Sequence, residues 1–265
     1  MLNYFLYRNA WICDDASHKE VQLSDEELKM LLKQGGLMVR NTYDFDTPYE
    51  ASFWFVINDH YSGLEELSPR VRNKTRHADK YFDYKQVEYE KFEQDIFHIF
   101  EDTIANYKVH DRELNRKKFS VFLEQCRQKT FEYWGMFLKD TSQMVGYCMV
   151  KNWGDSCEIW NVGVLAKYKR EGYYPYYGLY YHLNEYYLKE KGFRYISDGS
   201  RTITNHSEIH EWLIHYFGFR KAYCKLKLHY KWWFGIIVRT LYPFRSIISN
   251  RSVKAVLKMH GMQTK

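Results

Sequence analysis

The sequence of 265 residues has no stretch that could cross a membrane, because no run of the roughly 18 residues needed for a span is free of charge. Its start, MLNYFLYRNAWICDD, lacks a basic stretch followed by a clean apolar run, so we expect no signal peptide. The five cysteines are far apart, odd in number and mostly within apolar patterns, and no pair has metal-ligand spacing. These absences indicate buried thiols in a reducing cytosol, hence a cytoplasmic protein without a metal site.

The sequence also lacks internal repeats and low-complexity segments. Apolar residues make up 45% of the chain and charged residues 27%, which favours a packed core over disorder. The length allows one large domain or two small ones. Aromatic residues reach 19% and include 25 tyrosines.

Acidic residues are missing from the C-terminal end of the chain. Residues 230–265 contain seven basic residues and no acidic one, which leaves 32 basic and 33 acidic residues, a net charge of −1, in the remainder. The overall net charge of +6 therefore comes from the tail. A uniformly basic nucleic-acid-binding protein would not show this distribution, so we expect no DNA partner.

The first half of the chain predicts alternating strands and helices. Ser24 to Glu27 form a capping box, which predicts a helix that ends at Gly35 and Gly36. Apolar runs predict strands, and apolar residues at helical spacing predict helices. The strands are expected at 37–40, 51–58 and 82–88, and the helices at 64–80, 92–104 and 119–126.

The second half predicts a hairpin-rich sheet. Three consecutive strands, 133–139, 144–151 and 157–164, are joined by hairpin-like turns. A helix at 175–191, a strand at 195–198, a helix at 209–217 and a strand at 224–230 follow. This order predicts an α+β fold with a mixed, largely antiparallel sheet flanked by helices. We expect an N-terminal α/β extension (1–80) packed on a main domain (81–230), and a basic aromatic tail (231–265).

One segment, Val164-Leu-Ala-Lys-Tyr-Lys-Arg-Glu-Gly-Tyr-Tyr-Pro175, joins the third central strand to the long helix. Together with the order of elements from 82 to 230, it resembles the GNAT acyltransferase superfamily, whose loop reads Val-x-Pro-x-x-Arg-Gly-x-Gly-x-Gly/Ala. Val164 and Gly172 match this pattern, whereas Ala166, Lys169, Arg170 and Tyr174 stand at the Pro, Arg, first Gly and last small positions. The segment Tyr216-Phe-Gly-Phe-Arg220 is similar to the Gly-Phe signature between the family's last helix and strand.

The resemblance implies a GNAT-like fold that binds acetyl-CoA or another acyl-CoA. A turn that leads into a helix N-terminus presents amide protons and the positive end of the helix dipole, so a diphosphate can bind there. Tyr174, however, replaces a residue that must be small for the backbone to approach phosphate closely. The alternative is a basic loop on a scaffold that has lost its donor. The implied donor residues are Val162 and Val164 for the pantetheine arm, and Lys169, Arg170, Gly172, Tyr173 and Tyr174 for the diphosphate.

Three residues are candidates for proton transfer. Asp198 and His206 lie in a polar stretch after a short strand, where either could act as general base for an acceptor amine or hydroxyl. The resemblance implies a tyrosine near the end of the penultimate helix as general acid, and Tyr216 is close to that position. The structural alternatives are a turn at Asp198, a solvated His206, and a core position for Tyr216.

A basic helix supplies a second, weaker resemblance. Arg72, Arg76 and Lys80 fall on one helical face, and with the preceding strand this stretch is similar to the basic helix of FemAB-like peptidyltransferases. That family carries two GNAT-type modules and uses aminoacyl-tRNA. A solvated basic face is the ordinary alternative.

The tail from Lys231 to Arg245 mixes aromatic residues with spaced arginines. It could lie in an anionic membrane interface, or it could be an apolar strap packed over the sheet and followed by a basic helix at 249–260. Packing is favoured because Trp232 and Trp233 directly extend a strand.

These patterns together predict an acyltransferase that moves an acetyl or acyl group from acyl-CoA to an amine or hydroxyl of a small or sugar-linked acceptor. One alternative is a FemAB-like transferase, in which tRNA would be a partner. The other is a non-catalytic scaffold that binds a membrane surface or a protein partner through its tail.

Overall fold

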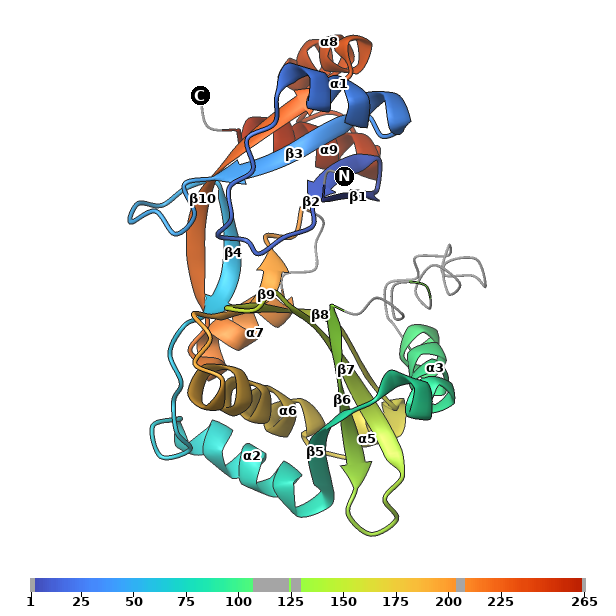
Figure 1. The fold of residues 1–265 in the computed structure, drawn as a ribbon, viewed down its shortest axis with the longest axis vertical. Helices are drawn as coiled ribbons and strands as arrows, with labels where there is room; N and C mark the ends of the chain where they lie inside the picture. The colour runs from blue at the N-terminus through green and yellow to red at the C-terminus, as the bar shows by residue number, and fades with distance from the viewer. Residues whose placement is uncertain (1–2, 107–123, 125–129, 204–207, 264–265) are drawn as a thin grey trace. The chain divides into compact units, whose positions relative to one another are not determined.

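The computed structural model describes residues 3–106, 124, 130–203 and 208–263, which form two compact units (Figure 1). Each unit is assembled from segments that are far apart in the sequence. Unit 1 comprises residues 1–56, 200–211 and 220–265, and unit 2 comprises residues 57–199 and 212–219.

Unit 2 is built on a mixed sheet in the order β9-β8-β7-β6-β5. β5 to β8 pair antiparallel with their neighbours, whereas β8 and β9 are parallel. Every residue of β7 from Met144 to Lys151 is buried, so helices must cover both faces of this sheet. The strands are β5 (Phe82–Val87), β6 (Phe131–Leu138), β7 (Met144–Asn152), β8 (Cys157–Val164) and β9 (Ile196–Ser200).

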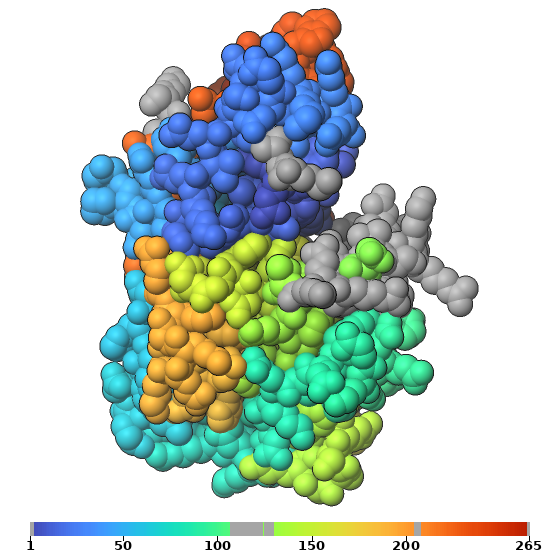
Figure 2. Space-filling model, in the orientation of Figure 1, coloured from blue at the N-terminus to red at the C-terminus, as the bar shows by residue number. Residues whose placement is uncertain are grey.

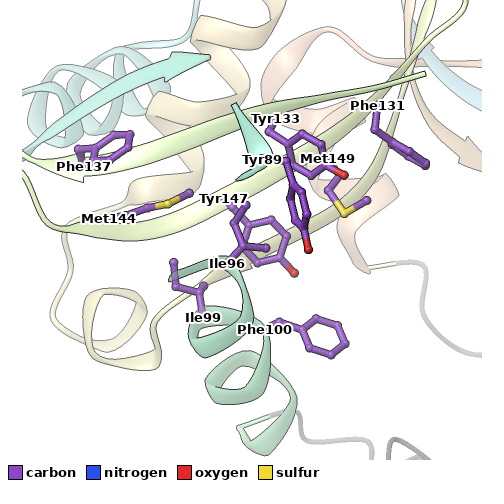
Figure 3. Packing of buried hydrophobic residues seen from close by; sticks show 10 residues of the cluster. All are labelled: Tyr89, Ile96, Ile99, Phe100, Phe131, Tyr133, Phe137, Met144, Tyr147 and Met149. Atoms are coloured by element: carbon purple, nitrogen blue, oxygen red, sulfur yellow. The ribbon is translucent and has the colours of Figure 1, made fainter. Parts of the chain in front are cut away.

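Helix α3 (Tyr89–Ala105) covers one face of this sheet (Figures 1 and 3). Its residues Ile96 and Ile99 are fully buried against Tyr147 and Met149 of β7, and Phe131 of β6 belongs to the same cluster. Burial of large apolar side chains contributes about 1.5–3 kcal/mol each relative to exposure, so this cluster fixes α3 on the sheet.

Helix α6 (Pro175–Asn184) covers the other face and continues as a π-helical turn over Glu185–Glu190. It is buried almost all round, because α2 (Pro69–Tyr81) packs on its outer side (Figure 1). Close approach to β5 is possible because Gly178 has no side chain. A Cβ atom at Gly178 would lie 2.2 Å from the hydroxyl oxygen of Tyr84, which donates a hydrogen bond to the Pro175 carbonyl at 3.0 Å.

Unit 1 contains the strand order β1-β2-β3-β10 and most of β4. β10 shows the alternation that the sequence predicts, with Ala222, Cys224, Leu226 and Leu228 buried. The strands are β1 (Tyr4–Tyr7), β2 (Ala10–Cys13), β3 (Met38–Tyr43), β4 (Phe53–Asn58) and β10 (Arg220–Tyr230).

Unit 1 also contains three helices. A fourth helix, α7 (Glu208–Phe217), has residues in both units. The predicted capping box begins α1 (Asp25–Gln34): the Ser24 hydroxyl accepts from the Glu27 amide, and the Glu27 carboxylate accepts from the Ser24 amide at 2.8 Å. The other two are α8 (Trp232–Leu241) and α9 (Arg251–Gly261). Among the residues described, no helix has the length and apolar character to span a membrane.

The predicted α+β class with a mostly antiparallel sheet is confirmed, and so are the strands from 82 to 230. One expectation is wrong: Trp232 and Trp233 do not extend strand β10, which ends at Tyr230, but begin helix α8. The loop after Val164 contains a short helix that the sequence pattern did not indicate, α5 (Ala166–Arg170). The expected helix at 119–126 lies outside the described residues.

Gly178 tests the packing of α6 on β5. We expect Gly178→Ala to lower the free energy of unfolding by about 1–3 kcal/mol, because the new methyl group must displace the tyrosine ring that stacks on His182. Chemical denaturation of wild type and variant measures the difference. Gly63→Ala is the control, since its Cβ would meet only Glu66 at an ordinary 3.4 Å; equal stability of the two variants would contradict the close approach of α6 to Tyr84.

Candidate functional site

Strands β8 and β9 part from each other soon after they begin. Only two residue pairs join them, Cys157 with Ile196 and Glu158 with Ser197, although β8 runs on to Val164. A bulge lies just beyond the last pair: Met149 of β7 faces Asn161 and Val150 faces Ile159, so Trp160 is an extra residue in β8. Because a bulge bends its strand and increases the twist, β8 turns away from its parallel neighbour at this point.

The parting leaves one edge of β8 open. The amide of Leu165 donates to the Val145 carbonyl of β7 at 3.0 Å, and main-chain groups of a strand alternate between its two edges. The amide and carbonyl groups of Val162 and Val164 therefore point to the edge opposite β7. The Val164 carbonyl accepts from the Thr103 hydroxyl of α3 at 3.4 Å.

Asp198 of β9 lies at this parting. The Tyr180 hydroxyl of α6 donates to the Asp198 carboxyl, with 3.4 Å between the oxygens. Removal from water raises the pKa of Asp198 to about 8; the Tyr180 hydrogen bond opposes this shift and the negative charge of Glu158 adds to it. A carboxyl with such a pKa exchanges a proton near neutral pH, as a general acid or base must.

The surroundings of Tyr180 contribute to the partial burial of Asp198. Its ring lies 5.5 Å from that of Trp212 and 6.0 Å from that of Phe217, centroid to centroid. Cys148, which faces Val162 across the β7–β8 ladder, is fully buried and lies close enough to influence both Asp198 and Tyr180 electrostatically. The carboxyl is thus placed on the same side of the sheet as the Val162 side chain and α6.

The predicted diphosphate loop is only partly suited to that ligand. Helix α5 forms the first half of this loop. The first amide of the helix, that of Ala166, donates to the Asp102 carboxylate at 2.6 Å. The Arg170 guanidinium donates to the Asn106 side chain at 2.6 Å. Lys169 is exposed at its surface, and partial desolvation lowers its pKa against the opposing effect of Asp102. Three cations, Lys167, Lys169 and Arg170, therefore lie beyond the end of β8, and Arg170 is already hydrogen-bonded.

The second half of the loop offers few amide donors. Gly172 has φ +76°, a backbone conformation that favours glycine, and faces open space. Tyr174 has a left-handed φ of +57°, Pro175 has no amide proton, and the Tyr177 amide donates back to the Tyr174 carbonyl. The Tyr173 ring packs on the rings of Tyr81, Phe82 and Tyr168. A diphosphate here would depend more on side-chain cations than in a glycine-rich loop.

The two other candidates for proton transfer are placed differently. Tyr216 is half-buried among aromatic rings, 6.0 Å from both Tyr177 and Trp212, and the Arg70 guanidinium lies 5.6 Å from its ring centre. His206 lies outside the described residues. Within the described ranges, no group of three metal-ligating side chains could hold a metal ion.

The basic residues of helix α2 make two different kinds of contact. Arg72 and Arg76 both pair with Glu65, at 3.0 and 2.6 Å, so the face expected to be basic is partly neutralised. Lys74 points instead toward α6, with its ammonium 4.5 Å from the Tyr174 ring centre and 4.7 Å from that of Tyr177. Lys74 and Arg70 thus form a basic and aromatic patch with the beginning of α6 and the end of α7.

Tyr180 and Glu158 were not predicted as site residues. Tyr180 is one of several tyrosines in α6, and nothing in their spacing distinguishes it. Glu158 lies in a strand otherwise recognised by its apolar residues. Only pairing of β8 with β9 brings Glu158 and Asp198 near each other.

No protein-family model and no curated protein match the sequence. Among solved structures, FemX matches with a TM-score of 0.48 and 11% identity over 77% of this chain and 68% of that chain. L-PGS from Bacillus licheniformis matches with 0.48 and 11% over 91% and 77%. A GCN5-related N-acetyltransferase-like protein from Streptococcus suis matches with 0.40 and 11% over 85% and 82%. These distant similarities identify neither a donor nor an acceptor.

The pKa of Asp198 predicts a pH-dependent stability. Because this pKa rises from 3.8 to about 8 on folding, the protonated carboxyl stabilises the fold fully below about pH 4, and that contribution is lost as the pH rises through about 8. We expect Asp198→Asn to become increasingly more stable than wild type over this range and the difference to level off above it. Urea denaturation at a series of pH values measures this.

Asp155→Asn, at an exposed carboxylate, is the control and should follow the wild type throughout. A carboxyl carbon NMR titration reports Asp198 directly. A midpoint near the ordinary 3.8 would show that the carboxyl is hydrated, contrary to its placement beside Tyr180.

Proposed function

We propose that the chain is a transferase of GNAT-like architecture that moves an acetyl or other acyl group from acyl-CoA to an amine or hydroxyl of a small or sugar-linked acceptor. The observation that supports this most is the open edge of β8 beside a carboxyl that titrates near neutral pH. A donor can lie along the edge, and its reacting end can meet the proton-transfer group.

The open edge suits the pantetheine arm of CoA. That arm is an extended chain with two amide groups, and an extended ligand can hydrogen-bond to a free strand edge as an added strand would. The amide and carbonyl of Val162, which is half-buried, would be its partners, whereas Val164 is fully buried. Lys169 and Arg170 lie past the end of β8, where they would attract the diphosphate at the other end of the same ligand.

Asp198 would remove and return the proton in the reaction. As the acceptor nitrogen or oxygen forms its bond to the acyl carbon and the carbon–sulfur bond breaks, the Asp198 carboxylate removes the acceptor proton. It then returns that proton to the CoA thiolate, so the products are the acylated acceptor and free CoA. The Tyr180 hydroxyl holds the carboxyl in position through its hydrogen bond.

A second candidate, transfer from aminoacyl-tRNA, is favoured by one observation. Arg70 and Lys74 lie against the rings of Tyr216, Tyr174 and Tyr177, a combination of cations and aromatic rings that suits phosphates and unstacked bases. The 3′ end of a tRNA has both. The shared chemistry of transfer at Asp198 would be unchanged.

Binding of the donor tests the open edge without knowledge of the acceptor. We expect acetyl-CoA or CoA to raise the melting temperature of the wild type, since a ligand that binds only the folded state stabilises it. Val162→Pro removes one amide from the edge and should weaken binding by about tenfold, the value of one well-formed hydrogen bond in a partly buried site. Isothermal titration calorimetry measures the affinity.

Val162→Ala is the matched control, because it shortens the side chain but keeps the amide. It should bind within about threefold of the wild type, as no hydrogen bond is lost. An equal loss of CoA affinity in both variants would show that the effect comes from packing. If no acyl-CoA stabilises the folded wild type, acyl-CoA is not the donor.

The two donors are separated by their dependence on salt. We expect CoA to bind at both low and physiological salt. We expect tRNA to bind only weakly at low salt and not at all at physiological salt. Tight tRNA binding, with an affinity that falls steeply with salt and drops on Lys74→Gln, would instead support the aminoacyl-tRNA alternative. Lys80→Gln, at the C-terminal end of α2, is the matched control for charge. Failure of both donors would favour the non-catalytic scaffold.

A further inference from the structure

Helix α8 carries large apolar side chains on its outward side. Trp232 is 79% exposed and Ile236 54%, and Trp233 and Ile237 are also exposed. At 100° per residue these four side chains share one side of the helix, while Gly235 and Val238 are buried on the opposite side. A helix on the surface of a water-soluble unit normally shows the reverse arrangement, with its polar side outward.

The apolar surface continues past the end of α8. Phe244 is 53% exposed and Ile247 78%. In contrast, the other exposed large apolar residues of the described chain are dispersed over β1, α1, α2, α7 and connecting loops. We call residues 232–247 with this exposed side the apolar face; Figure 2 shows part of the segment, in orange-red, beside the blue residues of α1.

Cations lie within the apolar face segment and shortly after it in the sequence. Arg239 at the flank of α8, Arg245 after it, and Arg251 and Lys254 of α9 are exposed, and the chain has no acidic residue from Tyr230 onward. The Arg245 guanidinium lies 4.5 Å from the centre of the Tyr242 ring. Such a pair is amphipathic and suits an interface between an apolar phase and water. Tryptophan, phenylalanine and isoleucine beside arginine and lysine are the composition of interfacial helices.

A cavity opens between α1, the end of β10 and α8. Its volume is about 570 Å³, and its wall combines apolar groups such as Leu28 and Ile236 with three basic side chains, Lys29, Lys231 and Arg239. Asp25 and His229 also line it, so the wall is basic overall but not uniformly so. Burial and the charge of Lys227 lower the pKa of His229, whereas Asp25 raises it. A phospholipid headgroup with the start of its acyl chains has the matching combination of anionic and apolar parts.

We propose that the apolar face docks on the surface of an anionic phospholipid bilayer, with the tryptophans and isoleucines in the headgroup region and the cations of this part of the chain on the lipid phosphates. The charge distribution selects this partner over a second copy of the chain. Two copies joined through this face would bring the same arginines and lysines together, which costs free energy, whereas an anionic surface neutralises them. The α8 helix has ten residues, so it lies on the bilayer and does not cross it.

Co-sedimentation of the full chain with vesicles tests the proposal. We expect binding to vesicles of phosphatidylcholine with about 30% phosphatidylglycerol, and much weaker binding to phosphatidylcholine alone. The double variant Trp232→Ser/Ile236→Ser should lower the partition coefficient at least about tenfold, through loss of buried apolar area. Arg239→Gln/Arg245→Gln should lower it about fivefold per cation for anionic vesicles only.

Two control variants match these changes elsewhere in the chain. Tyr49→Ser removes a side chain that is 66% exposed in unit 1, and Arg194→Gln removes an exposed cation of unit 2. Both should bind vesicles as the wild type does. Circular dichroism and the melting temperature report whether each variant is folded. We expect all variants to fold, because the outward side chains of α8 do not support a core.

Three results would overturn the proposal. The first is a wild type that stays in the supernatant with anionic vesicles at low salt, and the second is a double variant that still sediments like the wild type. The third is a dimer that sedimentation velocity detects without lipid, that Trp232→Ser/Ile236→Ser abolishes, and that does not bind vesicles; a second copy would then cover the apolar face. None of these results bears on acyl-CoA binding at β8, which involves other residues.

Discussion

The single extra residue in β8, Trp160, is the constraint on which the candidate site depends. A regular ladder would continue the pairing of β8 with β9 past Glu158 and Ser197. The bulge bends β8 while its other edge stays paired to β7. The result is a strand held firmly on one side and open on the other, and such an edge is where an extended ligand can add itself to the sheet.

Burial by aromatic side chains then gives this opening its chemistry. Helix α6 is enclosed by the sheet, by α2 and by the end of α7, and its tyrosines fill the spaces between them. Tyr180 is therefore packed on Trp212 and Phe217 and holds a carboxyl in a place that water reaches poorly. An aspartate on a hydrated loop would be ionised throughout the neutral range, whereas desolvation raises the pKa of Asp198 to about 8, so this carboxyl can exchange its proton near neutral pH. The tyrosine-rich composition thus has a local consequence for acid–base chemistry.

The differences between expectation and structure have local physical causes. The tail was expected to pack because Trp232 and Trp233 follow an alternating strand, but the chain turns into α8 after Lys231, where close packing of Gly235 on Tyr230 directs the helix and leaves the tryptophans outside. The loop after Val164 was expected to be a phosphate-binding turn, yet Asp102 accepts the first amide of α5 and so supports a short helix there. In both places a contact with a residue distant in the sequence, or a single glycine, decides between conformations that local pattern allows.

The class of fold, the strands from Phe82 to Tyr230 and the capping box of α1 could be predicted from local patterns, because they follow from periodicity and from hydrogen bonds between residues a few positions apart. The polar stretch after a short strand also made Asp198 a candidate, together with His206, while Tyr216 was a candidate from its place in the helix. Folding of the whole chain was needed to bring Tyr180 and Glu158 beside Asp198, to turn the Val162 amide away from β7, and to leave the apolar side of α8 exposed. Proximity between distant segments, and the burial that changes a pKa, exist only once the sheet has closed around its helices, and no local spacing encodes them.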